Sequence, residues 1–477
     1  MSNRILLING RILGDARDAV LIEEGKIAKL FYSSEIEIKD AHTVIDLQGD
    51  LLLPGFIDCH VHMVGTGMAT TEIDLANATS VEEVLSILLD GIKGREIVMA
   101  RNLAPHRLKE RRYPTIEELD RISTPIPIVI RREDFHSGVC NTKAFEMLGM
   151  NPVEVLRGRE FEYVQEKLIK LIKPEEYEIA YSKVSEIALQ NGVTTISGIF
   201  SNLQEYEVWL QIKDKLPITI VPFIETRIPK DLKERGLSSI IWDGRLLIDG
   251  SISSGTAALF EDYVDEPGNK GILYFSDYEL QQFLYEADGL QIAMHAIGDR
   301  AITQLVNAYS KIQPHRHRIE HCELIGTEEG RDLLKIIKEK DIIISAQPSF
   351  EAHFGKVYEE KLGKERALQM NPFRKIIDMG VHLAFGSDSP VTPIEPLKGI
   401  KSAISHPNPE YRITQEEAIR CFIYEGAYAN FLENKIGEIK EGFEADLIGV
   451  STNFSSVNLV IKGGKLCQLS LLDWKSF

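Results

Sequence analysis

The apolar positions in the central part of the chain follow two alternating patterns. Short runs rich in β-branched and aliphatic residues, typical of buried strands, alternate with longer segments whose apolar residues recur at helical spacing. The predicted strands are residues 56–62, 193–199, 218–225, 246–249, 291–295, 318–321, 342–346 and 382–386. Strand-then-helix units repeated eight times favour parallel pairing and a closed (β/α)8 barrel, a TIM-like fold of the α/β class.

Both ends of the chain show a different pattern, of short strands separated by tight turns. Residues 4–8, for example, run into Asn9-Gly10, a strong hairpin signal. Chain termini commonly lie close together, so we expect the two ends to form one composite β-sandwich domain. The interval after the first barrel strand is too long for one connection, and we expect an inserted substrate-pocket domain there. The predicted boundaries are 1–54 with 436–477 for the β-sandwich, 55–63 with 191–435 for the barrel, and 64–190 for the insert.

Composition narrows the functional class. The chain has 54 Lys and Arg against 72 Asp and Glu, a formal charge of −18, which argues against a nucleic-acid partner. Five cysteines in 477 residues do not form a disulfide framework. No apolar run approaches the ~20 residues that span a bilayer, and the first apolar stretch is too short for a signal peptide. We therefore expect a cytoplasmic enzyme with a small-molecule substrate and no membrane partner; homo-oligomer formation is left open.

The candidate chemistry lies at the ends of the predicted strands. His60 and His62, separated by one residue, point to the same face of the first strand, because strand side chains alternate. His295, His321 and Asp388 each end a later predicted strand. Any one of these residues alone would suit a structural role. Four histidines and one aspartate at four strand ends of one barrel face predict a divalent metal site.

Several sequence segments together resemble the amidohydrolase superfamily of metal-dependent barrel hydrolases. Within it, the chain is similar to the amidohydrolase-3 branch that includes N-substituted formamide deformylase. The matching segments are PGFIDCHVH (54–62), DFHS (134–137), DGS (249–251), HAIGDR (295–300), RIEH (318–321) and GSDSP (386–390). The resemblance runs nearly end to end and in order.

The resemblance implies a role for each candidate ligand. His60 and His62 would hold a first ion, and His295 and His321 would hold a second ion or orient the substrate carbonyl. Asp388 would bind metal and take the proton of the attacking water. A divalent ion lowers the pKa of water from about 15.7 towards ~7 and polarises a carbonyl. Zn is the default metal, although Fe, Mn, Co and Ni suit the same ligands.

One position departs from the pattern of the family. Related barrels commonly carry a carboxylated lysine on the fourth strand that bridges two metals, and Arg245 stands where that lysine would align. Arginine stays protonated and cannot form a carbamate. Three alternatives remain open: a site with one ion, a bridge from another carboxylate such as Glu225, or a different alignment.

Residues on the substrate side are also implied by the resemblance. Asp134, His136 and Asn141 of the insert would lean over the barrel mouth, where a histidine can stabilise an oxyanion. Asp249 and Gly250 would reach the pocket from the fourth strand, with the glycine allowing a ligand close to the backbone. A turn cap at Asp134 and a tight loop at Gly250 would explain the same residues without a substrate.

These observations favour a metal-dependent hydrolase of amide or formamide-like C–N bonds in a small molecule. Deamination of a ring amidine is the enzymatic alternative, ranked lower because the strand ending in His295 has no nearby glutamate to protonate a ring nitrogen. A catalytically dead barrel with a binding or regulatory role is the alternative outside enzymes.

Overall fold

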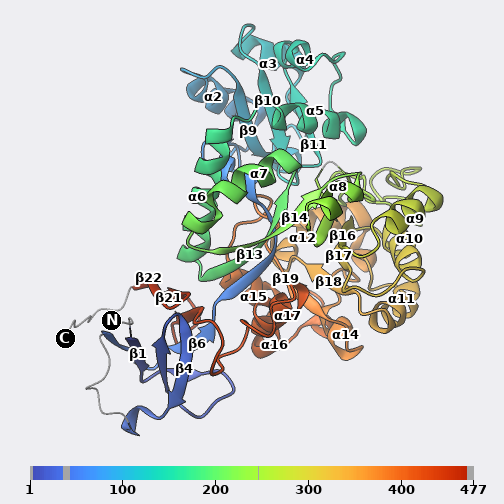
Figure 1. Cartoon of the computed structure of the whole chain (residues 1–477). Helices are drawn as coiled ribbons and strands as arrows, with labels where there is room; N and C mark the ends of the chain where they lie inside the picture. The colour runs from blue at the N-terminus through green and yellow to red at the C-terminus, as the bar shows by residue number, and fades with distance from the viewer. Residues whose placement is uncertain (1–3, 36–42, 245, 470–477) are drawn as a thin grey trace.

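The computed structural model describes residues 4–35, 43–244 and 246–469. At its centre, eight parallel strands pair in the order β19-β18-β17-β16-β15-β14-β13-β7, so that each strand lies beside the next one along the chain (Figure 1). The strands are β7 (Phe56–His62), β13 (Val193–Phe200), β14 (Thr219–Glu225), β15 (Ser239–Trp242), β16 (Gln291–Ala296), β17 (Arg318–His321), β18 (Ile343–Ala346) and β19 (Leu383–Phe385).

The first and last strands meet through the segment that follows β19. The amide of Asp388 donates to the carbonyl of His60 at 2.8 Å. The amide of Ser387 donates to Asp58 Oδ1 at 2.9 Å. These bonds leave the sheet nearly closed, and the predicted TIM-like barrel is confirmed.

The fourth barrel strand is β15, and the prediction of a strand at residues 246–249 is wrong. Those residues are buried, but they form a loop after the turn at Gly244, whose φ is 144°. The loop makes isolated backbone bonds, such as Ile248 N to His295 O at 3.3 Å, and no strand ladder. A short apolar run does not distinguish a buried strand from a buried loop, which explains the error.

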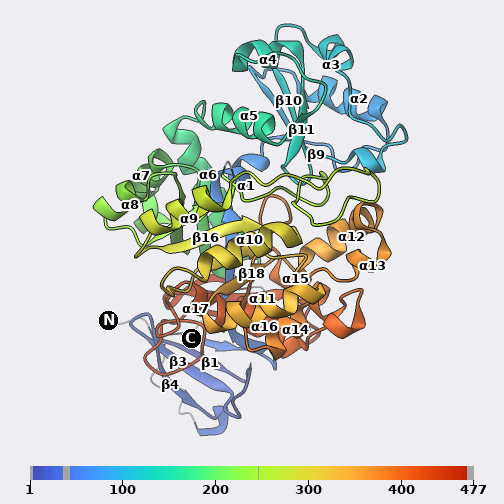
Figure 2. The same ribbon diagram turned by 90° about the vertical axis from the view of Figure 1, so that its right-hand side faces the viewer.

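Helices cover the outside of the barrel (Figure 2). Their inner faces carry apolar residues at helical spacing, as in α10, where Ile302, Leu305, Val306 and Tyr309 are all buried. The helices other than the four between residues 81 and 169 are α1 (Met63–Ala69), α6 (Pro174–Gln190), α7 (Leu203–Ile212), α8 (Pro229–Glu234), α9 (Asp277–Glu286), α10 (Asp299–Tyr309), α11 (Glu328–Glu339), α12 (Ser349–Leu362), α13 (Lys364–Ala367), α14 (Phe373–Asp378), α15 (Pro396–Ile404), α16 (Gln415–Phe422) and α17 (Tyr424–Ala429).

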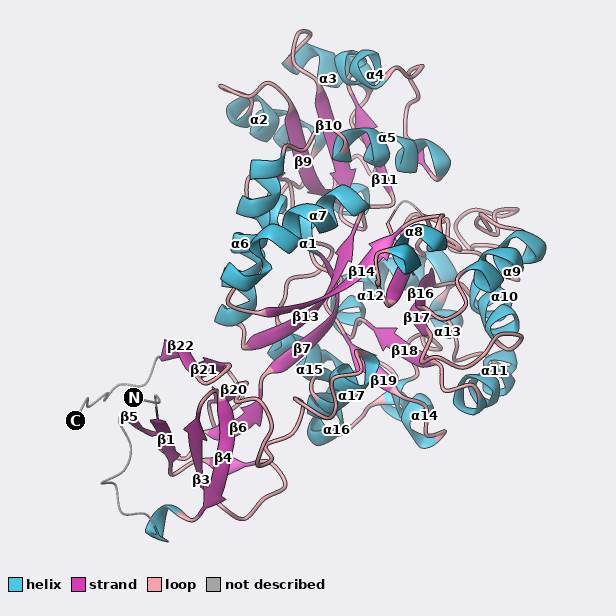
Figure 3. Cartoon of the chain, in the orientation of Figure 1, coloured by secondary structure: helices cyan, strands magenta, loops and turns pink. Residues whose placement is uncertain are grey.

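Two sheets built from the chain ends lie at one end of the molecule (Figure 3). The first contains β1 (Arg4–Ile8), β3 (Ala19–Glu23), β4 (Lys26–Phe31) and β5 (Thr43–Asp46). The second contains β2 (Arg11–Ile12), β6 (Leu51–Pro54), β20 (Leu447–Val450), β21 (Val457–Lys462) and β22 (Lys465–Leu469). Antiparallel pairing of β6 with β20 joins the two ends, and Leu7, Leu52 and Leu459 share one core between the sheets.

The inserted segment forms its own sheet at the opposite end of the molecule (Figures 1 and 2). Its strands are β8 (Ile73–Asp74), β9 (Val98–Leu103), β10 (Ile128–Arg132), β11 (Ser137–Cys140) and β12 (Leu156–Arg157). Its helices are α2 (Val81–Gly91), α3 (Ile116–Ile122), α4 (Thr142–Leu148) and α5 (Arg159–Ile169). In the described part of the chain, no helix combines the length and apolar character that crossing a membrane requires.

Candidate metal centre

The first two predicted ligands stand together at the carboxyl end of β7. His60 is fully buried and His62 is partly exposed, with their ring centroids 5.5 Å apart. Asp388, three residues beyond β19, brings its Oδ1 to 3.3 Å from His60 Nε2 and 3.1 Å from His62 Nε2. The structure therefore brings together one carboxylate and two imidazoles that could hold one metal ion.

The other two predicted histidines lie beside this group. His295 on β16 and His321 at the end of β17 have ring centroids 4.5 Å apart, and His321 lies 5.1 Å from His60. His321 and Asp388 both have left-handed backbone, with φ of 68° and 56°. Such conformations are strained for residues with side chains and concentrate at functional sites. The four predicted histidines and Asp388 thus converge at the carboxyl ends of the barrel strands, whereas the predicted Glu225 is not in either metal-holding group of the described residues.

A sixth residue, Asp243, was missed by the sequence interpretation. It follows β15 directly, is 4% exposed, and its carboxylate lies among the site histidines. Its Oδ2 lies 3.1 Å from His321 Nε2, and these two residues with His60 form a second group that could hold a metal ion. A Trp-Asp-Gly sequence after an apolar run was the available signal, but the wrong assignment of the fourth strand obscured it.

Neighbouring acceptors orient three of the four imidazoles. His60 Nδ1 lies 2.6 Å from Glu320 Oε2, and His321 Nδ1 lies 2.7 Å from Gln347 Oε1. His295 Nε2 lies 3.1 Å from the carbonyl oxygen of Gly250. In each ring, the second nitrogen then faces the carboxylates of the site. Histidines that ligate metals characteristically bond an acceptor through their other ring nitrogen, which fixes the tautomer and the ring orientation.

The charges of the site are strongly coupled. Burial lowers the pKa of His60, but the carboxylates of Asp243 and Asp388 outweigh it and raise this pKa well above its ordinary value. Burial likewise opposes ionisation of both aspartates, yet the nearby histidines hold the pKa of each below its usual range. His321 has a lowered pKa, through burial and the proximity of His295.

The residues present fit a divalent metal ion. Among the described residues, His60 Nε2, His295 Nδ1 and Asp388 Oδ1 are buried without a hydrogen-bond partner. Buried polar atoms are normally paired, and unpaired buried atoms of this kind are suited to binding an ion. Imidazole and carboxylate donors suit Zn, Fe, Mn, Co and Ni alike.

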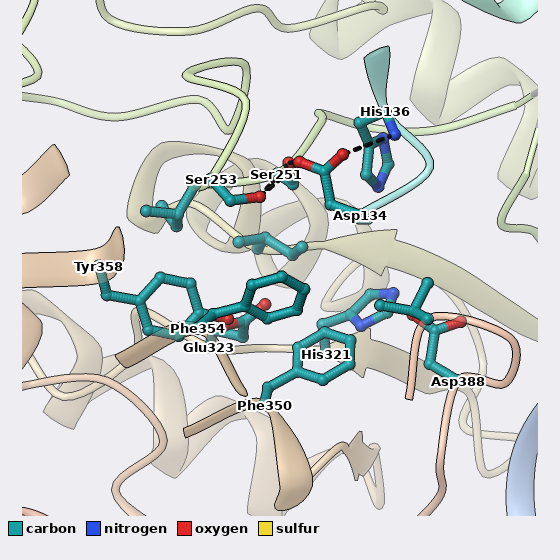
Figure 4. A pocket seen from close by; sticks show the side chains of 13 residues that line it. Asp134, His136, Ser251, Ser253, His321, Glu323, Phe350, Phe354, Tyr358 and Asp388 are labelled. Atoms are coloured by element: carbon teal, nitrogen blue, oxygen red, sulfur yellow. Dashed lines mark hydrogen bonds between the residues drawn. The ribbon is translucent and has the colours of Figure 1, made fainter. Parts of the chain in front are cut away.

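The insert contributes the predicted Asp134 and His136 to a pocket beside this centre (Figure 4). Asp134 Oδ2 accepts hydrogen bonds from Ser251 and Ser253, and its Oδ1 accepts from the amide of His136 at 3.1 Å. The His136 ring lies 5.3 Å from the ring of His295. Burial, followed by the proximity of His295, lowers the pKa of His136 to about 4, so this ring is neutral at pH 7.

The remaining wall of the pocket is largely apolar. Phe350, Phe354 and Tyr358 of α12 line it, together with the buried Glu323 (Figure 4). Its volume is about 20 Å3, room for little more than a water molecule. A substrate therefore needs more space than this conformation provides.

The structure places four other predicted residues in structural positions. Asn141 caps α4, accepting from the amides of Ala144 and Ile128 at 2.9 Å each, and it does not line the pocket. Glu225 Oε1 accepts from the amide of Leu246 at 2.7 Å, and the metal-holding groups found among the described residues do not include it.

The other two belong to the loop after β15. Asp249 accepts from three backbone amides, those of Ala258, Ile297 and Gly298, and so holds this loop against its neighbours. At Gly250 a Cβ would lie 2.1 Å from Thr256 Oγ1, so the chain itself requires this glycine. Arg245 lies outside the described residues.

Comparison with known proteins agrees with this architecture. Residues 43–460 match the family described as Amidohydrolase family. Protein LONG AFTER FAR-RED 3 of Arabidopsis thaliana is 26% identical, covering 91% of this chain and 84% of that protein. N-substituted formamide deformylase of Arthrobacter pascens is 23% identical, covering 93% of this chain and 92% of that protein.

A solved structure supports the same assignment. The crystal structure of an uncharacterized metal-dependent hydrolase from Pyrococcus horikoshii OT3 superposes with a TM-score of 0.80 at 25% identity. It covers 98% of this chain and 100% of the Pyrococcus chain. The family match spans the whole barrel and includes every residue of the candidate metal centre. The predicted resemblance is therefore confirmed: this chain belongs to the amidohydrolase family.

Proposed function

We propose that the protein hydrolyses a C–N bond of an amide or formamide-like group in a small molecule. The supporting observation is the convergence of four imidazoles and two carboxylates at the ends of five barrel strands. His60, His62 and Asp388 would hold a divalent ion, with Asp243, His295 and His321 completing the centre. A divalent ion, with Zn as the first candidate, supplies a lowered pKa for water and a polarised carbonyl.

Asp388 would move the proton in this reaction. Its Oδ1 is buried and has no hydrogen-bond partner among the described residues, while its backbone amide is tied to the carbonyl of His60 at 2.8 Å. Oδ1 lies beside His60 and His62, where it would bind the ion, and the same carboxylate could accept the proton of the attacking water. The same group can return that proton to the leaving nitrogen, which departs as an amine.

Two histidines would act on the substrate carbonyl. His136 is neutral and can donate from its ring to the oxyanion that forms during attack. His321 is held by Gln347 on one nitrogen and faces the pocket. Asp134 holds the insert loop that carries His136 against the barrel loop, through its bonds to Ser251 and Ser253.

Deamination of a ring amidine is a second candidate, which one observation favours. Glu323, two residues after His321, is buried in the pocket wall, where a carboxyl could protonate a ring nitrogen. The strand that ends in His295 carries no glutamate, so the sequence pattern alone does not indicate this residue. Release of ammonia distinguishes this reaction from amide hydrolysis.

The test is product analysis with metal-loaded protein and a panel of N-substituted formamides, other N-acyl amines and ring amidines. We expect formate or another carboxylate together with a free amine. Asp388→Asn should lower kcat by about 10²–10⁴-fold, the range typical of general acid–base groups. Full activity in an Asp388→Asn variant that still binds metal would refute the proton role. Unfolding that is unaffected by added Zn²⁺, with no metal bound, would instead favour a dead barrel.

A further inference from the structure

Asp243 differs from the other acids of the barrel in the number of site histidines it reaches. Its carboxylate lies 3.4 Å from His60 Nε2 and 3.8 Å from His62 Nε2 on β7. It lies 3.7 Å from His295 Nδ1 on β16 and 3.1 Å from His321 Nε2 on β17. Within the described residues, no other carboxylate has an ion-pair distance to all four.

The backbone holds Asp243 in this position. Asp243 follows the last residue of β15, where a parallel barrel strand delivers its side chain to the catalytic end of the barrel. Gly244 then turns the chain with a φ of 144°, a conformation that favours glycine. A Cβ on Gly244 would lie 3.3 Å from Glu225 Oε1. The turn therefore begins directly after the strand, which ends at Trp242, and leaves the Asp243 carboxylate between the histidines of β7 and those of β16 and β17.

The histidines of the site form two pairs, His60 with His62 and His295 with His321, and among the described residues each pair has one buried ring nitrogen without a hydrogen-bond partner. Of the buried atoms without a hydrogen-bond partner in the described ranges, His60 Nε2 belongs to the pair on β7 and His295 Nδ1 to the pair on β16 and β17. Both lie within 4 Å of Asp243. Two separate sets of donors thus share one carboxylate.

We propose that Asp243 is a bridging ligand, shared by two divalent ions, in the place that a lysine carbamate takes in related barrels. His60, His62 and Asp388 would hold one ion, and His295 and His321 the other. Assembly of the centre would then require no carbon dioxide, because an aspartate is a carboxylate without modification. This inference rests on the proposed function, in that the centre must bind metal. It also explains how the centre can hold two ions although Arg245 replaces the lysine of related barrels, since an arginine side chain cannot form a carbamate.

A negative ligand between two dications offsets their mutual repulsion, so neutralising Asp243 should release one of them. The experiment strips the full-length protein of metal and reloads it with Zn²⁺ or Mn²⁺, in buffer free of carbon dioxide and in buffer with bicarbonate. Metal per chain is measured after desalting. Electron paramagnetic resonance of the Mn²⁺ form reports whether two ions are magnetically coupled, as ions sharing a carboxylate are.

The variants are Asp243→Asn and, in case that one folds poorly, Asp243→Ser. Glu225→Gln is the matched control, a buried strand-end glutamate whose Oε1 bonds a backbone amide. We expect about two coupled ions per chain in the unmodified protein and in the control, with and without bicarbonate. Either Asp243 variant should hold at most about one ion, without coupling, and bicarbonate should not restore the second.

Other results separate the inference from the function on which it rests. Two coupled ions in the Asp243 variants, a single ion in the unmodified protein, or loading that requires bicarbonate would overturn the bridging role alone. Loss of an ion in Glu225→Gln with retention in Asp243→Asn would assign the bridge to Glu225. Absence of metal from the unmodified protein after reloading would overturn the proposed function as well.

Discussion

Glutamine in place of Glu320 would test the electrostatic support behind the metal centre. Glu320 is fully buried, with Oε1 at 2.7 Å from Arg318 Nε and Oε2 at 2.6 Å from His60 Nδ1. Burial raises the pKa of this carboxyl, but Arg318 and His60 outweigh it and hold the pKa below its ordinary value. The carboxylate therefore neutralises a buried arginine and orients a candidate ligand at the same time.

The expected loss of stability follows from the cation that remains. Arg318 is 1% exposed, inside the barrel. Removing one partner of a buried ion pair typically costs about 3–5 kcal/mol, because the other charge stays buried without compensation. Glutamine can still accept a hydrogen bond from Arg318, so we expect the lower end, ~3 kcal/mol. The weaker hold on His60 should also lower metal affinity by about 10–100-fold.

The matched control is Glu205→Gln on α7. Glu205 is equally buried, but it accepts from the Tyr181 hydroxyl at 3.1 Å and the Ser201 amide at 2.8 Å, both uncharged donors. Burial raises its pKa to about 7. A neutral amide at this position leaves no buried cation without its counter-ion. We expect a change in the free energy of unfolding of ~1 kcal/mol or less at pH 7.5.

Urea unfolding of metal-free protein, followed by circular dichroism, measures both variants against the unmodified chain. Zn²⁺ competition with a chromogenic chelator gives the change in metal affinity. If Glu320→Gln and Glu205→Gln lose the same stability within ~1 kcal/mol, the argument from the buried Arg318 charge is refuted. If metal affinity is unchanged in Glu320→Gln, the orienting role of Glu320 towards His60 fails.

Three further predictions concern residues outside the centre. The folded-state pKa of Glu205, about 7, lies above its ordinary value of 4.5, so stability should fall as pH rises through that window. Glu205→Gln should remove this part of the pH dependence, and an unchanged profile would contradict it. Asn141→Ala should cost about 0.5–2 kcal/mol through loss of the α4 cap, while a large rise in KM would restore Asn141 to the substrate site. Gly250→Ala should destabilise by about 1–3 kcal/mol through its clash with Thr256, with partial recovery in a Gly250→Ala/Thr256→Ala double variant, measured by thermal unfolding.

The barrel and most of its centre could be predicted because the information is local. Apolar runs of strand length between amphipathic helices set the repeat, and side-chain alternation puts His60 and His62 on one face whatever the rest of the chain does. Parallel strands in a barrel end at the same side, so His295, His321 and Asp388 could be expected near them from position alone. To predict the position of each of these ligands, only the strand that carries it had to be identified correctly.

Asp243, Asn141 and Asp249 could not be assigned in this way. The run at residues 246–249 is as apolar as a strand, and only packing against the barrel decides that it forms a buried loop while β15 ends at Trp242, just before Asp243. The polar roles of Asn141 and Asp249 depend on which backbone amides come within reach, and those amides belong to segments up to 49 residues away. By itself, the sequence determined seven of the eight barrel strands, their order, and the four histidines and Asp388 at their ends. The tertiary structure alone decided which carboxylate lies among the four histidines, because that depends on distances between strands and no single strand encodes them.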